Sequence, residues 1–216
     1  MKKITCGILC ALIAFAMIFA LAACGGTDDT EKFVGIWKSE QQLSNYMDLL
    51  GEMDVDDPEI LDYLKLDGIS ITIMLTFNKD GTFISMINKE SYETAMKKIF
   101  ENTIIATIED TIATMGLDMS VDEYLAELET TIDELYAQSI DEEVLSEGLA
   151  QSSRMGNWKV ENGKLYTTNE LSADFDMSAY ETYTISGTTL TLTGIVGSGA
   201  DDAAIGAVYP MTFTKQ

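Results

Sequence analysis

The pattern of apolar and polar residues changes period along the chain and divides it into strand-like and helix-like parts. Over residues 69–77, apolar side chains alternate with mostly polar ones, which predicts a strand with one buried face. The turn sequence Asn78–Gly81 follows, so this strand is expected to pair with the next one in a hairpin. After residue 156 the two-residue period returns, and Asn162-Gly163 marks another hairpin tip. The pattern predicts eight strands, at residues 33–38, 69–77, 82–88, 157–161, 164–168, 180–185, 189–193 and 208–214.

Between these strands lies a segment with the 3.6-residue period of a helix. One apolar stripe from Tyr92 to Met115 predicts a long helix that ends at Gly116. Capping-box patterns that begin at Ser120 and Ser139 predict the starts of two more helices. The same pattern at Ser39 predicts a helix directly after the first strand. The helices would form two insertions, at about residues 40–66 and 90–152.

Eight short antiparallel strands in a chain of this size favour an α+β, mainly β fold built on an eight-stranded antiparallel barrel. Closure of the barrel would remove the exposed strand edges that an open sheet leaves. Residues 33–216 are expected to form this one domain. The barrel interior is the default ligand site, and its candidate residues are Trp37, Ile71, Ile73, Leu75, Trp158 and Tyr183. The alternative is that the interior is a filled core, with both tryptophans plugging one end.

Two Gly-x-Trp sequences stand at comparable places in the strand pattern, Gly35-Ile36-Trp37 and Gly156-Asn157-Trp158. The first is similar to the Gly-x-Trp of lipocalins. Together with residues 75–83, 156–165 and 183–192, it resembles the lipocalin-like domains of surface lipoproteins in Gram-positive, clostridia-like bacteria, many of unknown function. The resemblance covers about residues 33–88 and 156–214, and it implies a barrel that holds a small apolar ligand. The helical insertions depart from the plain barrel.

The N-terminus carries a second resemblance. A positive start (Met1–Lys3) and an apolar stretch end at Leu21-Ala22-Ala23-Cys24, which is similar to the lipobox of bacterial lipoproteins. The resemblance implies that residues 1–23 are a signal peptide, and that Cys24 receives a diacylglyceryl group with palmitate-like chains. Residues 24–32 would then be the lipidated cysteine and a flexible tether, holding the protein on the outer face of the cell membrane. The alternative is an uncleaved transmembrane anchor, for which the apolar stretch is nearly long enough.

The amino-acid composition excludes several classes of partner, catalytic site and metal site. The chain has 13 basic and 36 acidic residues, a net charge of -23, so nucleic acid is excluded as a partner. It has no histidine, which excludes Ser-His-Asp and Cys-His catalysis and histidine-ligated zinc. Cys24 is the only cysteine after residue 23, so the folded part has no internal disulfide or thiolate metal site. No cofactor or metal is therefore expected.

Acidic clusters are the remaining candidates for chemistry. Residues 54–59 and 201–202 could offer oxygen ligands to calcium, but the first cluster lacks the glycine and distal glutamate of an EF-hand loop. No pair of carboxylates is singled out for glycoside hydrolysis. We therefore expect a non-catalytic protein that binds a small apolar ligand or an envelope component. The alternative is a protein interaction module that acts through the acidic insertion, whose acids otherwise form a solvated face.

Overall fold

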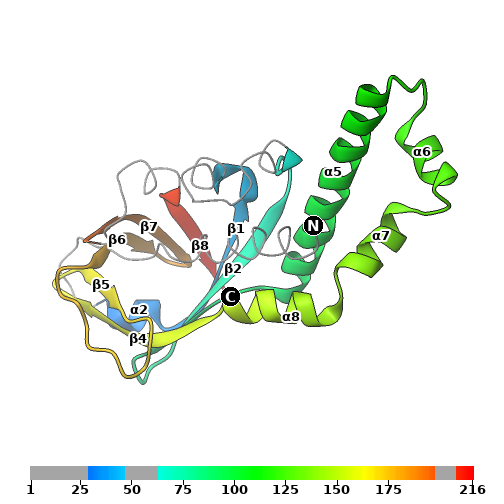
Figure 1. Ribbon diagram of the computed structural model, residues 1–216. Helices are drawn as coiled ribbons and strands as arrows, with labels where there is room; N and C mark the ends of the chain where they lie inside the picture. The colour runs from blue at the N-terminus through cyan, green and yellow to red at the C-terminus, as the bar shows by residue number, and fades with distance from the viewer. Residues whose placement is uncertain (1–28, 47–62, 198–207) are drawn as a thin grey trace.

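The protein folds as a closed eight-stranded antiparallel barrel with a helical insertion (Figure 1). The computed structural model describes residues 29–46, 63–197 and 208–216. The strands follow one another around the barrel in chain order, and β8 closes it by pairing with β1. They are β1 (Gly35–Gln42), β2 (Ser70–Phe77), β3 (Thr82–Ile87), β4 (Arg154–Glu161), β5 (Lys164–Thr167), β6 (Tyr180–Ser186), β7 (Thr189–Val196) and β8 (Met211–Lys215). The predicted fold class is thus confirmed.

Alternation along each strand determines which side chains face the interior. In β2 every second residue from Ile71 to Phe77 is buried, and the residues between them are partly exposed. The predicted turn at Asn162-Gly163 joins β4 to β5, and both residues have positive φ, 53° and 67°. Positive φ at both central residues is the requirement of a type I′ hairpin, which explains the Asn-Gly pair.

The connections between strands place different structures at the two ends of the barrel. Because neighbouring strands are antiparallel, successive connections alternate between the ends. The short hairpins β2–β3, β4–β5 and β6–β7 lie at one end, together with the short helix α2 (Thr30–Phe33) and the end of β8. We call this end the floor. The other end, the mouth, carries the long connections β1–β2, β3–β4, β5–β6 and β7–β8.

The floor is joined to the N-terminal end of the described chain by specific contacts. The indole Nε1 of Trp37 donates to the carbonyl oxygen of Phe33 at 2.6 Å. The ammonium of Lys215 lies 5.0 Å from the Trp37 ring centroid and donates to the carbonyl oxygen of Lys32 at 2.8 Å. Asp29 is buried, with 8% exposure, and accepts from the Tyr183 hydroxyl at 3.2 Å. The folded part therefore includes residues 29–32, which precede the predicted start at Phe33.

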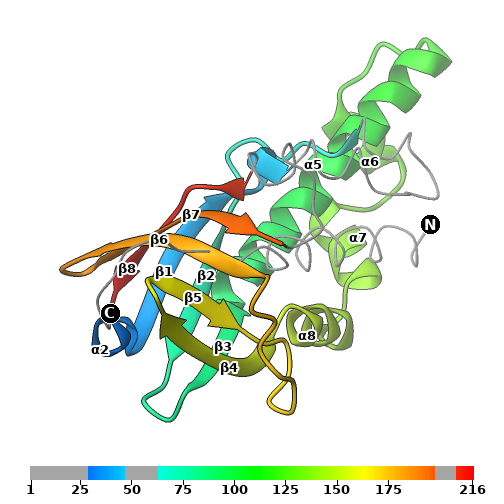
Figure 2. The ribbon, with the colours of Figure 1, turned by 90° about the vertical axis from the view of Figure 1, so that its left-hand side faces the viewer.

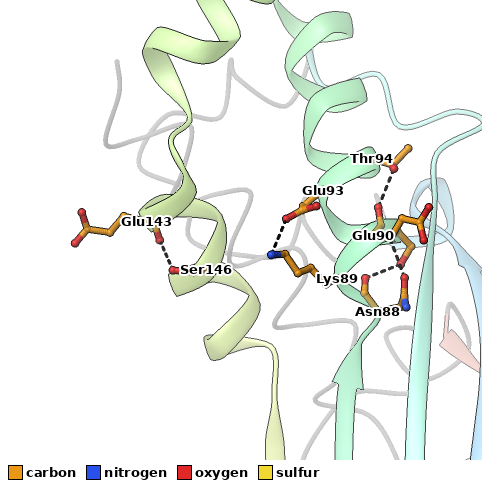
Figure 3. Close-up of polar contacts among 8 residues, drawn as sticks. Asn88, Lys89, Glu90, Glu93, Thr94, Glu143 and Ser146 are labelled. Carbon is orange, nitrogen blue, oxygen red and sulfur yellow. Dashed lines mark hydrogen bonds and ion pairs between the residues drawn. The ribbon is translucent and has the colours of Figure 1, made fainter.

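The insertion between β3 and β4 is an arm of four helices that leaves the barrel and returns to it (Figures 1 and 2). Its helices are α5 (Lys89–Met115), α6 (Val121–Glu127), α7 (Ile132–Ser139) and α8 (Glu142–Gln151). Helix α5 starts at Asn88, whose side-chain oxygen accepts from the Ser91 backbone N–H at 3.0 Å, beside the Lys89–Glu93 ion pair (Figure 3). None of the described helices has the length and apolar character needed to cross a bilayer.

The long helix α5 packs in two halves. Its first half buries Tyr92, Met96 and Ile99 in the main core. Its second half extends away from the barrel, and Ile108 and Ile112 form a separate small core with Leu125 of α6. The end of the predicted stripe, Met115, is 64% exposed, so the last turn of the stripe does not pack as expected.

Three helix starts differ from the sequence-based expectation. Ser39 lies inside β1, which runs to Gln42 and is followed only by the 3-10 helix η1 (Leu43–Tyr46). Pairing with β2 along its whole length holds this segment extended and overrides the capping-box pattern. Thr131 starts a separate helix, α7, with its own capping box, so the expected second helix is two short ones. Helix α8 is capped by Asp141 rather than by Ser139.

Candidate functional site

Aromatic side chains seal the floor of the barrel. The Phe33 ring lies 4.7 Å from the Tyr183 ring, 5.2 Å from the Phe77 ring and 5.8 Å from the Trp158 ring, centroid to centroid. The indole Nε1 of Trp158 donates to the carbonyl oxygen of Asn78 in the β2–β3 turn at 3.0 Å. The rings are packed edge to face or tilted, as buried aromatic side chains prefer. These aromatic side chains therefore close this end of the barrel, and a ligand cannot enter through it.

All six residues predicted for the barrel interior lie inside it, at different heights. Trp37, Trp158 and Tyr183 belong to the floor, so both tryptophans plug this end of the barrel, as the filled-core alternative expected. Ile71 and Ile73 lie nearer the mouth, because β2 starts at the mouth and runs to the floor, with Leu75 below them. Ligand contact by any of the six stays a prediction. Cys24 lies outside the described residues.

An ionisable side chain, Glu181, lies on the inner face of the barrel. It is the second residue of β6, two positions on the mouth side of Tyr183, and it has no exposed surface. Its register partners are Leu165 on β5 and Ile195 on β7. Within the described part of the chain, neither of its carboxyl oxygens has a hydrogen-bond partner. A buried carboxyl group without a partner is rare, because the lost hydration is not replaced.

Burial raises the pKa of Glu181 well above its usual range. Desolvation penalises the carboxylate, so the neutral acid persists to higher pH than it does for an exposed glutamate. The pKa of Tyr209 is also raised, first by burial and then by the negative charges that Glu181 and Tyr46 would carry. Burial likewise raises the pKa of Tyr46, whose hydroxyl lies 3.4 Å from Oε1 of Gln41. The mouth half of the barrel therefore contains a buried carboxyl group and two buried phenols, and burial raises the pKa of all three.

Other buried polar groups on the inner face have partners. Ser39, 3% exposed, donates to the carbonyl oxygen of Thr212 at 2.6 Å and accepts from the Gln41 amide at 2.5 Å. These bonds link β1 to β8 and serve the fold. No comparable hydrogen bond accounts for the presence of a glutamate at position 181. A leucine of similar size would fit the surrounding apolar wall without the desolvation penalty.

Sequence reasoning did not select Glu181, although the strand pattern contains the signal. In the segment 180–185, Glu181 is in phase with Tyr183 and Ile185, the apolar residues expected to face inward. An acid in phase with the buried face of a predicted strand is unusual and is a better marker than acid clusters on the surface. The overall excess of acidic residues concealed it.

The acidic clusters considered for calcium fall outside the described residues, at 54–59 and 201–202. Among the residues that are described, no group of three or more acids and cysteines is close enough to hold a metal ion.

The arm has its own surface pocket. A pocket of about 700 Å³ opens between α5, α6 and α7, with Ile105, Leu125 and Ile132 among its lining residues. Glu101, Asp122 and Glu129 are also part of its wall, so the pocket is polar at its edges. Its position on a narrow, solvent-exposed arm suits contact with another molecule better than enclosure of a small one.

Comparison with family models, with curated proteins and with solved structures gave no match for this chain.

Proposed function

We propose that this chain is a non-catalytic binding protein whose barrel takes up a small, largely apolar ligand through the mouth. The observation that supports this most directly is the asymmetry of the barrel: an aromatic floor closes one end, and the long connections between strands start and end at the other. Eight-stranded barrels with apolar walls are able to hold one small ligand in this way. The upper wall offers apolar side chains, Ile71, Ile73, Leu165, Leu192 and Met211. The lipocalin-like resemblance belongs to the same proposal, and the closed barrel supports it.

The first test is native mass spectrometry of the chain from Gly25 to Gln216, which contains every residue of the described fold, purified from its own host. A reproducible small apolar adduct that is lost on unfolding is the expected result. Binding is then measured with N-phenyl-1-naphthylamine, a neutral fluorescent probe. We expect Leu192→Phe, inside the barrel, to weaken probe binding, and Met155→Phe, an exposed position on β4, to leave it unchanged. A chain without an adduct that also fails to bind the probe would refute the proposal.

We further propose that the protein is a lipoprotein held by a diacylglyceryl group on Cys24 at the outer face of the cell membrane. The lipobox resemblance supports this. The chain from Cys24 to Asp29 spans at most about 18 Å when fully extended. Since Asp29 is fixed to the floor through Tyr183, the floor would face the membrane and the mouth would face away from it. Growth with an alkyne-labelled fatty acid should label the wild type and not the Cys24→Ser variant.

The orientation is tested separately on the acylated protein in vesicles. A dye is attached to a cysteine introduced at Asn162, in a floor hairpin, or at Leu117, on the arm; both positions are exposed. Nitroxide-labelled lipid should quench the dye at residue 162 more strongly than the dye at residue 117. Equal quenching would contradict the orientation while leaving the lipid anchor intact.

A second candidate function is a protein contact made by the arm. Exposed apolar side chains on the arm favour it: Met115, Leu117 and Leu128 are 64%, 43% and 57% exposed. A photo-crosslinking residue placed at Leu128 should capture a specific envelope protein in cells, and the same residue at Asn162 should not. Capture at both sites or at neither would remove this candidate.

A further inference from the structure

We propose that Glu181 recognises a protonated amine, so that the barrel's ligands are amphipathic cations with an apolar body and one cationic nitrogen. This inference rests on the proposed ligand-binding function and adds the chemical class of the ligand. It identifies Glu181 as the residue that determines specificity.

The carboxyl group of Glu181 has unused hydrogen-bonding capacity. Both of its carboxyl oxygens lack partners among the described residues, although the side chain has no exposed surface. An ammonium group carries several N–H donors, and charge-assisted bonds to a carboxylate are about twice as strong as neutral ones. The apolar register partners Leu165 and Ile195 leave the rest of the neighbourhood suited to the apolar body of the ligand.

A negative charge on Glu181 would have no positive charge beside it among the described residues. Burial is the only cause of the raised Glu181 pKa, and no lysine or arginine in the described chain opposes it. Tyr209, whose pKa is raised in part by the charges that Glu181 and Tyr46 would carry, is a phenol, and so is Tyr46; neither supplies a positive charge. A bound cation would supply the missing positive charge, whereas an anionic ligand would add a second negative one. A neutral alcohol could bond to the protonated acid, but without this electrostatic gain.

The charge of the arm beside the mouth also favours a cation, independently of Glu181. The arm leaves the barrel at the mouth, and over residues 89–152 its 16 acidic residues are opposed by three lysines, Lys89, Lys97 and Lys98, of which Lys89 is paired with Glu93. Lys97 is already paired, with Asp133 at 2.7 Å and Glu101 at 3.8 Å. A field of one sign near an entrance raises the local concentration of ions of the opposite sign. Cations are therefore concentrated at the end through which the ligand would enter.

Binding of the amine has a defined proton balance. The ligand arrives as R–NH3+ and the side chain is a neutral carboxylic acid. In the complex the ammonium donates to the carboxylate, and the carboxyl proton passes to solvent. The raised phenol pKa values keep Tyr46 and Tyr209 protonated throughout. At any pH between the ordinary and the raised pKa of Glu181, each bound amine should thus release up to one proton.

The test compares three probes of equal length, decylamine, decanol and decanoate, as competitors of N-phenyl-1-naphthylamine. We expect decylamine to bind the chain Gly25–Gln216 at least about tenfold more tightly than the other two. Glu181→Gln should weaken decylamine binding roughly tenfold or more and change decanol binding by less than about threefold. Glu170→Gln, at an exposed position in the β5–β6 connection, is the matched control and should change neither.

Calorimetry in two buffers of different ionisation enthalpy measures the number of protons released on binding. A merely structural role of Glu181 would not change this number. Decylamine should release about one proton on binding to the wild type and none on binding to Glu181→Gln. If the variant does not fold, the probe ranking and the proton release of the wild type still decide the matter. Equal affinity for decanol and decylamine, or binding without proton release, would overturn this inference alone. Failure of every probe to displace the dye would instead refute the proposed binding function.

Discussion

The pH dependence of stability tests the state of Glu181 without any ligand. The perturbation is Glu181→Gln, which keeps the size of the side chain and removes its titration. Burial raises the folded-state pKa of Glu181 well above the ordinary value of about 4.3 that it has in the unfolded chain. Between these two values the folded protein holds a proton that the unfolded chain has lost. The free energy of unfolding therefore falls as pH rises through this window, because ionisation favours the unfolded chain.

The magnitude follows from one proton. Within the window, the contribution of Glu181 to the free energy of unfolding falls by about 1.4 kcal/mol per pH unit, and below the unfolded-state pKa it is constant. The Gln variant lacks this term, so its stability relative to the wild type should rise as pH increases above about 5, with a limiting slope of about 1.4 kcal/mol per pH unit. Other carboxylates titrate equally in both proteins and cancel in the difference.

Urea unfolding followed by tryptophan fluorescence is a suitable assay, because Trp37 and Trp158 are both buried in the floor. Wild type, Glu181→Gln and the exposed control Glu170→Gln are compared at several pH values without ligand. A difference between wild type and Glu181→Gln that stays constant from pH 5 to pH 6 would refute the argument. It would mean that the carboxyl group is solvated or paired in solution, and the amine proposal would lose its basis.

Two further predictions concern the frame that holds the site. A methyl group added by Gly156→Ala would collide with the backbone carbonyl of Thr168, so thermal unfolding should show a loss of about 3 kcal/mol; Gly194→Ala, whose nearest neighbour is a side-chain oxygen at 3.3 Å, should lose much less. Lys215→Met keeps an aliphatic stem over Trp37 but removes the bond to the α2 backbone, and should lower the free energy of unfolding by about 1 kcal/mol in urea denaturation. Equal losses in the two glycine variants, or no loss at Lys215, would contradict these accounts.

The strands could be predicted because their signal is local. Each buried face alternates with period two, and the hairpin turns carry residues that tolerate positive φ, as at Asn162-Gly163. The capping box at Ser39 was misleading for the opposite reason. Its side chain fits a helix start, but the backbone of β1 pairs with β2 over eight residues, and these long-range bonds prevail over local preference.

The site was less predictable, since it depends on three-dimensional relations. The pattern placed Trp37 and Trp158 in the interior but could not indicate that both close the floor. That closure depends on Phe33 of α2, which packs at the same end of the barrel and contacts both tryptophans. The pattern also placed Glu181 on an inward face, yet its lack of partners depends on neighbours from other strands. Pairing between distant segments is not encoded in the period of any one of them.

The distribution of bonds inside the barrel separates structural from functional parts. At the floor, indole N–H groups, an ammonium and a carboxylate all have identified partners, which is the arrangement expected of a core that only has to be stable. Glu181, two residues nearer the mouth than Tyr183 on β6, is buried without any hydrogen-bond partner for its carboxyl oxygens among the described residues, and this burial does not stabilise the fold. Up-and-down connectivity places the long connections at this same end, so the mouth could vary in length and charge without disturbing the floor. The unsatisfied acid and the acidic arm are therefore two features of one end of the molecule, and both favour a cation.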